Sequence, residues 1–205
     1  NDPDRMLVGN DGGVGVSFDQ GGSWIFPNTM ALGQFYEVSY DMAVPYRVCG
    51  GLQDNGSWCG PSRRRNGANS NAFWAEVSGG DGFYTQQDPT NPNLIYSESQ
   101  GGRMGRLDYA TGERVGISPP GWRVRYNQWE DSIIVARGDE SQATTAARRT
   151  RIAELRAKQR ADSVLWDLRW NWNTPFLLSP HNPSVFYAGA NRVLKSTKRG
   201  EDLYP

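Results

Sequence analysis

The sequence of 205 residues has a single histidine, His181, only two cysteines and no long hydrophobic run. So few Cys and His residues exclude a zinc site built from several of them within the chain. No run approaches the ~18 apolar residues of a transmembrane helix, so we expect no membrane span. We expect no metal and no other cofactor. The 22 Lys and Arg residues balance the 22 Asp and Glu residues. This balance argues against a nucleic-acid-binding protein, because such proteins usually present a basic face.

Turn-forming and aromatic residues are abundant instead. The chain has 24 Gly and 12 Pro residues, together with 8 Trp, 9 Tyr and 7 Phe residues. Many turns combined with many strand-forming aromatics predict an all-β fold of short strands. The chain does not begin with Met, and we expect it to be a processed or truncated product, or the ordered part of a longer protein.

A short pattern occurs four times along the chain: a turn with proline, an apolar strand and a turn with glycine. Its prolines are Pro3, Pro45, Pro92 and Pro183, which are 42, 47 and 91 residues apart. The first two spacings match the ~40–50 residues of a four-stranded propeller blade. The third spacing is twice as long, which predicts an insertion.

The insertion is expected at residues 140–168, which contain neither Gly nor Pro and are rich in Ala, Arg, Glu, Lys and Gln. This composition favours a helix, and Ile152, Leu155 and Leu165 fall on one apolar stripe. The chain therefore divides into blades over 1–139, a helical insertion over 140–168 and a further partial blade over 169–205.

Aligning the four copies assigns a place to each strand. The predicted fold is all-β, a partial, open-arc β-propeller of about three to four blades with an α-helical insertion. Its ends expose unpaired backbone groups, so we expect other protein subunits, or more of the same protein, to cover them. The inner strands are expected at 35–41, 82–88 and 174–180, the third strands at 14–18, 105–109 and 193–197, and the outer strands at 24–26, 73–77 and 114–117.

One motif has the pattern S-x-D-x-G-x-[S/T]-W. Its residues are Ser17, Asp19, Gly21, Ser23 and Trp24. The Asp19 carboxylate can accept backbone N–H groups within the turn, and Gly21 permits a left-handed conformation there. We expect a structural role for this Asp box. A degenerate copy at 196–203 lacks the Asp and the Trp of the pattern.

Together with segments 50–58, 79–83 and 172–176, this motif resembles a family. It is similar to the Asp-box (BNR-repeat) β-propellers of the sortilin-like and glycosyl-hydrolase-like bacterial secreted proteins. The resemblance implies a large propeller outside the cytoplasm, in the periplasm or the extracellular space. It does not imply a particular activity.

A glycoside hydrolase needs two carboxylates flanking the scissile bond. Asp54 and Asp81, each in a Gly-rich loop near an inner strand, are the candidates, and Trp58, Trp74 and Tyr84 could stack on sugar rings. The alternative is that both Asp residues cap turns, and we expect this alternative. We identify no arginine cluster and no Tyr–Glu pair of the kind that sialidase chemistry requires.

Two further features concern stability and binding. Cys49 and Cys59 flank the turn around Asp54, where facing strand positions suit a disulfide; the alternative is two separately buried thiols. The helix carries six basic residues against one acidic residue, Glu154, over the same span. They form either a solvated face or a docking arm for an acidic protein surface or anionic lipid. The six are Arg148, Arg149, Arg151, Arg156, Lys158 and Arg160.

Two functions remain open from the sequence. The first is a non-catalytic binding or scaffolding subunit that docks on a larger assembly, at the outer face of a membrane complex. The second is a fragment of an Asp-box glycoside hydrolase or carbohydrate-binding propeller. We favour the first because of the open arc, the basic helix and the lack of an assured catalytic set.

Overall fold

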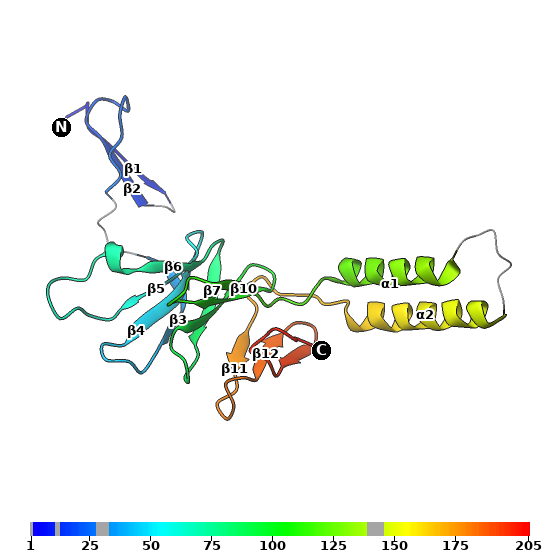
Figure 1. The fold of residues 1–205 in the computed structure, drawn as a ribbon. Coiled ribbons are helices and arrows are strands. Elements are labelled where there is room, and N and C mark those ends of the chain that lie inside the picture. The colour runs from blue at the N-terminus through cyan, green and yellow to red at the C-terminus, as the bar shows by residue number, and fades with distance from the viewer. Residues whose placement is uncertain (1, 11–12, 28–32, 139–145) are drawn as a thin grey trace.

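The computed structural model describes residues 2–10, 13–27, 33–138 and 146–205. These residues form a mostly β fold of four small antiparallel sheets and two helices (Figure 1). Within each sheet the strands follow chain order, and each pairs with the next. This meander pattern places strands from neighbouring segments side by side and needs only short turns.

The first sheet is a two-stranded hairpin of β1 (Met6–Asn10) and β2 (Gly13–Ser17). A single bridge between Val16 and Ile25 adds the start of a third strand. The hairpin stands apart from the other three sheets in Figure 1.

The second and third sheets each have four strands. The second is built from β3 (Phe35–Tyr40), β4 (Arg47–Leu52), β5 (Ser57–Pro61) and β6 (Ala75–Ser78). The third is built from β7 (Gly82–Gln87), β8 (Leu94–Ser99), β9 (Arg103–Asp108) and β10 (Arg114–Gly116).

The last sheet contains β11 (Phe176–Leu178), β12 (Phe186–Gly189) and β13 (Val193–Ser196). A bridge between Lys195 and Tyr204 lies where a fourth strand would be. No strand is predicted at this outer position from the sequence. In the second sheet, Phe73 lies in a short 3₁₀ helix (Asn71–Phe73), so the outer strand begins at Ala75 and not at Phe73. The other strands lie within about three residues of their expected bounds.

Two hydrophobic clusters join the last three sheets into one body. The first cluster contains Cys49, Cys59, Val77, Ile95 and Leu107. The second is larger and lies between β7–β10 and β11–β13. Adjacent residues on β8, Ile95 and Tyr96, belong to different clusters and are both fully buried, so the third sheet is covered on both faces. The second cluster contains Tyr96, Met104, Ile117, Phe176, Leu178, Phe186, Ala188, Leu194 and Leu203.

The helical insertion is a pair of helices, and not the single helix expected over 140–168. They are α1 (Trp122–Arg137) and α2 (Ala146–Leu165), and they project side by side from the sheets (Figure 1). Residues 140–145 lie outside the described residues, and 166–168 are not helical. Helix α1 is not predicted from the sequence, and it falls inside the range assigned to blades. Its β-branched residues, Val124, Ile133, Ile134 and Val135, individually favour strands.

Packing against α2 explains why α1 is nevertheless a helix. Ile133 of α1 and Leu155 of α2 are both buried. Arg125 forms an ion pair with Asp162 at 2.9 Å, and the Trp129 indole N–H donates to the same carboxylate at 2.8 Å. Tertiary contacts of this kind routinely override local propensity.

Candidate functional site

The two candidate catalytic carboxylates lie next to each other, and the contact between them is structural. The backbone N–H of Asp54 donates to Asp81 Oδ1 at 2.7 Å. Asp54 itself has a left-handed backbone with φ of 60°, and its turn is closed by Leu52 N–H donating to the Gly56 carbonyl at 2.8 Å. The Asp81 carboxylate thus ties the β4–β5 turn to the start of β7.

The hydrogen bond from the Asp54 amide lowers the pKa of Asp81, although burial opposes the shift. A lowered pKa favours the ionised carboxylate, which does not suit the proton-donating acid of a glycosidase. Of the three expected sugar-stacking aromatics, Trp58 lies at the Asp54 turn, whereas Tyr84 and Trp74 pack elsewhere. Trp58 donates to the Asn55 carbonyl at 2.6 Å, whereas Tyr84 packs on Phe176 with ring centroids 6.1 Å apart, inside the body. Trp74 lies over Gly60, on the face of β3–β6 that points away from the disulfide and β7–β10.

The Asp box forms a closed hydrogen-bonded turn. The Ser17 hydroxyl donates to Asp19 Oδ1 at 2.8 Å, and Ser23 donates to the same carboxylate through its N–H at 2.8 Å and its hydroxyl at 2.6 Å. These bonds, led by those from Ser23, lower the pKa of Asp19 to about 2. Gly21 has a φ of 90°, which permits its N–H to donate to Ser17 Oγ at 2.8 Å. The Asp19 carboxylate and the groups that donate to it are thus hydrogen-bonded to one another within the turn.

The degenerate copy at 196–203 folds into the same turn with its carboxylate moved. Asp202 lies where the first copy has Ser23, and it accepts a hydrogen bond from the Ser196 hydroxyl and one from Thr197 N–H at 3.1 Å. Gly200 has a φ of 94° and donates to Ser196 Oγ at 2.9 Å, as Gly21 does to Ser17. The consensus pattern reveals that Lys198 stands in place of the Asp, but not that a carboxylate four residues later replaces it.

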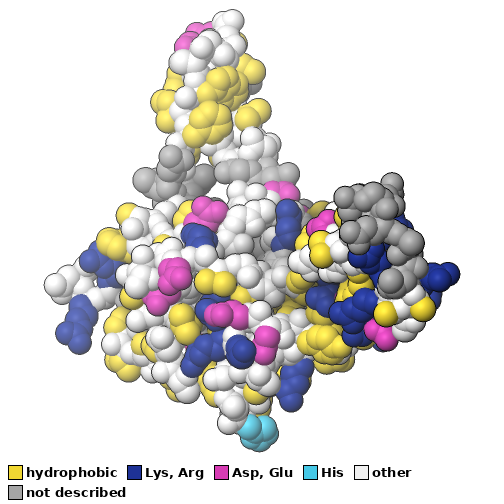
Figure 2. Space-filling view, turned by 45° about the vertical axis from the view of Figure 1, so that its right-hand side comes forward, with side chains coloured by type: hydrophobic (Ala, Val, Ile, Leu, Met, Phe, Trp, Pro, Cys, Tyr) yellow, Lys and Arg dark blue, Asp and Glu magenta, His cyan; other side chains and the backbone are white. Residues whose placement is uncertain are grey.

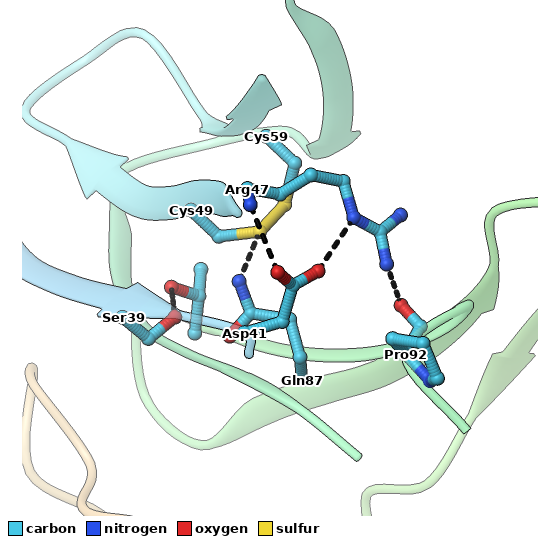
Figure 3. Close-up of a disulfide and its surroundings, with 8 residues drawn as sticks. Ser39, Asp41, Arg47, Cys49, Cys59, Gln87 and Pro92 are labelled. Carbon is cyan, nitrogen blue, oxygen red and sulfur yellow. Dashed lines mark hydrogen bonds and ion pairs between the residues drawn. A yellow bond between two sulfur atoms is a disulfide. The ribbon is translucent and has the colours of Figure 1, made fainter. Parts of the chain in front are cut away.

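Cys49 and Cys59 are joined by a disulfide between facing residues of β4 and β5 (Figure 3). Both cysteines are fully buried, and the Gln87 side chain donates to Cys49 Sγ at 2.9 Å. Near the disulfide, Arg47 forms an ion pair with Asp41 at 2.8 Å and also donates to the Pro92 carbonyl. This group of residues holds β3–β6 against β7–β10.

Glu98 on β8 is not among the residues predicted from the sequence, and its carboxyl group is fully buried between the third and fourth sheets. Its Oε1 accepts the Thr174 N–H at 3.1 Å, and burial raises its pKa to about 7. Oε2 has no hydrogen-bond partner among the residues that the structure describes. An acidic residue flanked by Ser97 and Ser99 looks like an exposed strand position. Only the burial of both faces of β8 reveals it.

The six basic residues of α2 divide between two flanks of the helix. Helical periodicity places Arg149, Arg156 and Arg160 on one side of the stripe that packs on α1, and Arg151 and Lys158 on the other. Arg148 lies on the packed side, beside Gly138 at the end of α1. Arg149, Arg151, Lys158 and Arg160 are exposed, and dark blue side chains are visible over this region at the right of Figure 2.

In the described ranges, no group of three or more His, Cys, Asp and Glu side chains is placed to hold a metal ion. Neither of the two described helices is long and apolar enough to cross a membrane. No protein-family model matches the chain, and no curated protein matches it significantly.

Proposed function

We propose that this chain is an open arc of β-propeller blades that acts as a non-catalytic binding or scaffolding subunit. The repeated pattern supports the propeller. Each of the last three sheets begins at an inner strand, follows chain order outward and packs face to face on its neighbour. The two Asp-box turns, at corresponding places in the first and last sheets, add to this support.

The observation that carries the binding role is the apolar surface at both ends of the stacked sheets. On the free face of β3–β6, Val38 is 58% and Tyr40 is 65% exposed. On the free face of β11–β13, Leu177 is 50% and Val193 is 71% exposed. Exposed apolar residues on one sheet face typically mark interaction surfaces. We infer that a partner protein covers the β11–β13 end, and that further protein, of a partner or of this chain, covers the β3–β6 end.

The helical pair supplies a second contact surface. It projects from the sheets and carries exposed basic residues on both flanks of α2 (Figures 1 and 2). The apolar stripe of α2 is used against α1, as the burial of Leu155 indicates. A membrane-surface helix needs such a stripe for the acyl region. We therefore propose an acidic protein surface as the partner of this arm and not an anionic lipid.

The proposed location is outside the cytoplasm, in the periplasm or at the cell surface, at the outer face of a membrane complex. The buried disulfide supports an oxidising compartment. This support is independent of the family resemblance.

The alternative, a fragment of an Asp-box glycoside hydrolase or carbohydrate-binding propeller, is supported by the adjacency of Asp54 and Asp81. Asp54→Ala and Asp81→Ala variants separate the two functions. We expect both variants to keep their association with the assembly. Unchanged association with loss of glycan turnover would instead favour the hydrolase.

The arm is tested by reversing the charge of its four exposed basic residues, Arg149, Arg151, Lys158 and Arg160, to Glu. We expect this variant to lose association with the native assembly by at least tenfold, measured by quantitative co-purification. Reversal of Arg63 and Arg65, two exposed residues of the β5–β6 loop, is the matched control and should change little. Binding of the chain to vesicles of phosphatidylcholine and phosphatidylglycerol, abolished by the same reversal, would contradict the proposed protein partner.

A further inference from the structure

A register rule relates the two packed junctions. The residue four positions after the repeat proline faces the following sheet: Cys49 follows Pro45, and Tyr96 follows Pro92. The residue three positions after the proline faces the preceding sheet, as Ile95 and Phe186 do. Cys49 and Ile95 share one core cluster, and Tyr96 stacks on Phe186 with ring centroids 5.5 Å apart. All four side chains are fully buried.

The same positions exist in the first hairpin, where they are exposed. Leu7, four residues after Pro3, is 71% exposed. It pairs across the hairpin with Val16, which bridges to Ile25, so an apolar row crosses this sheet. The rule states that this row faces the sheet that follows in the chain, β3–β6.

The receiving face of β3–β6 has the corresponding features. Val48, three residues after Pro45, pairs across the strands with Tyr40 and Gly60. A Cβ atom at Gly60 would lie 2.3 Å from the Trp74 ring, and one at Gly50 would lie 2.4 Å from the Phe35 ring. Because glycine has no side chain at these two positions, the Trp74 and Phe35 rings can lie directly against the strands. The result is an apolar and aromatic face on which the second sheet has no neighbour in Figure 1.

We propose that in solution the β1–β2 hairpin docks on this face of its own chain, with Leu7 against Val48. The connecting segment from 27 to 34 has eight residues, which span up to roughly 27 Å. In the docked arrangement the segment must run from the outer edge of the hairpin sheet, near Ile25, to β3 at the opposite edge of the next sheet. Stacked sheets lie about 10 Å apart, and three strand spacings across the sheet add about 14 Å at right angles to that distance. The segment must therefore span about 17 Å. The segment is therefore long enough.

Docking also has a thermodynamic reason. A two-stranded hairpin is marginally stable on its own in water. Here both of its faces are apolar, with Leu7 and Ile25 on one side and Met6, Val8 and Phe26 on the other. Figure 2 shows hydrophobic side chains gathered over this hairpin. Covering the Leu7 row removes apolar area from water on the hairpin and on β3–β6 at once.

The inference goes beyond the proposed binding role, because it determines which surface remains for a partner at this end. After docking, Val38 and Tyr40 are covered, and the open face is the one with Met6, Val8 and Phe26. It rests on strand register and chain length, so it can fail while the binding role holds.

The test is a methyl NOE experiment on the isolated chain, labelled at Ile, Leu and Val methyl groups. We expect a cross-peak between the Leu7 and Val48 methyl groups and none between Val8 and Val48, because Val8 lies on the opposite face. The variants Leu7→Ala and Val48→Ala assign the signals. The absence of cross-peaks from Leu7 to β3–β6 would overturn the proposal. So would a cross-peak that arises only between differently labelled copies in a dimer, since the occupant would then be a second copy.

A matched pair of variants gives a second readout. Leu7→Lys should increase hydrogen exchange of the β1 amides at least tenfold, because a buried ammonium opposes docking. Val8→Lys should leave their exchange nearly unchanged. Equal effects of the two variants would contradict the assigned face.

Discussion

The two packed junctions use the same register with different chemistry. Between β3–β6 and β7–β10, one aromatic pair, Tyr36 on Phe83 with ring centroids 4.9 Å apart, lies beside small and polar groups. There the Ser39 and Thr85 hydroxyls are 2.9 Å apart, and Gln87 donates to the disulfide sulfur of Cys49. Between β7–β10 and β11–β13, aromatic rings stack, with Phe186 lying 5.5 Å from Tyr96 and 5.2 Å from Phe176. Large rings bury the most apolar area, so we infer that the second junction contributes more to stability.

The ionic contacts at the two junctions run in opposite directions along the chain. Arg47 pairs with Asp41 of its own sheet and reaches forward to the Pro92 carbonyl. Arg199 of the last sheet reaches back to Asp88, which is fully buried at the end of β7. In both, an Asp that directly follows the first strand of its sheet also accepts N–H groups of the proline turn, from Arg47 at 2.9 Å and from Thr90 at 2.8 Å. The turn and the junction are therefore fixed by the same carboxylate.

The largest effect is expected from breaking the aromatic junction. Phe186→Ala should lower the free energy of unfolding by about 3–5 kcal/mol, because it removes a fully buried ring between two others. Urea denaturation measures the loss. Tyr187→Ala, one position along the same strand and facing outward, is the matched control and should cost less than half as much. Similar losses for the two variants would contradict the assigned junction.

The buried carboxyl group makes the second junction sensitive to pH. The pKa of Glu98 is raised to about 7 from an ordinary value of 4.5. The unfolded chain therefore releases this proton first, and stability should fall as pH rises from 4.5 through 7, by on the order of 3 kcal/mol. Glu98→Gln should remove this slope in urea denaturation between pH 5 and 8. A slope that persists in the variant would exclude Glu98 as its source.

The disulfide stabilises the first junction. Replacing both cysteines by Ala should lower the free energy of unfolding by about 2–3 kcal/mol, because the bond closes a loop between residues separated by 10 positions. Reduction of the natural chain should produce a similar loss. Since the aromatic junction is unaffected, hydrogen exchange at β12 should change less than at β4, and the reverse order would contradict this assignment.

The smallest effect concerns the two Asp-box turns. Asp202→Ser should lower the melting temperature, because Ser196, Thr197 and Lys198 lose their shared acceptor. Adding Lys198→Asp should restore it, since the turn then has the arrangement of Ser17, Asp19 and Ser23. If the double variant is no more stable than the single one, the two turns are not equivalent.

Much of the sheet architecture could be predicted from the sequence, because prolines and glycines mark every turn and apolar runs lie between them. Phe35–Tyr40 and Gly82–Gln87 are examples, each ending at an Asp before a proline turn. The second helix could be predicted for the same reason, since Ala, Arg, Glu and Lys dominate it. The first helix could not, because its Val and Ile residues favour a strand until α2 covers them.

The candidate site was predictable only in part. The residues of the Asp box and the facing cysteines follow local patterns, and the structure places them together. The buried state of Glu98 and the contact between Asp54 and Asp81 depend on how separate sheets pack, which a local pattern does not contain. The same is true of the replacement of one Asp-box carboxylate by Asp202, because it depends on turn geometry and not on the consensus.

The most direct test of a binding role is the native mass of the particle that contains this chain, with its polypeptides identified. We expect a particle well above the 22.9 kDa of the chain, with fixed stoichiometry. The Leu177→Lys, Val193→Lys double variant should dissociate from the particle, whereas Ala110→Lys, at an exposed position in the β9–β10 turn, should stay bound in it. A chain that runs at its own mass, and that turns over a glycan only while Asp54 and Asp81 are intact, would contradict the account.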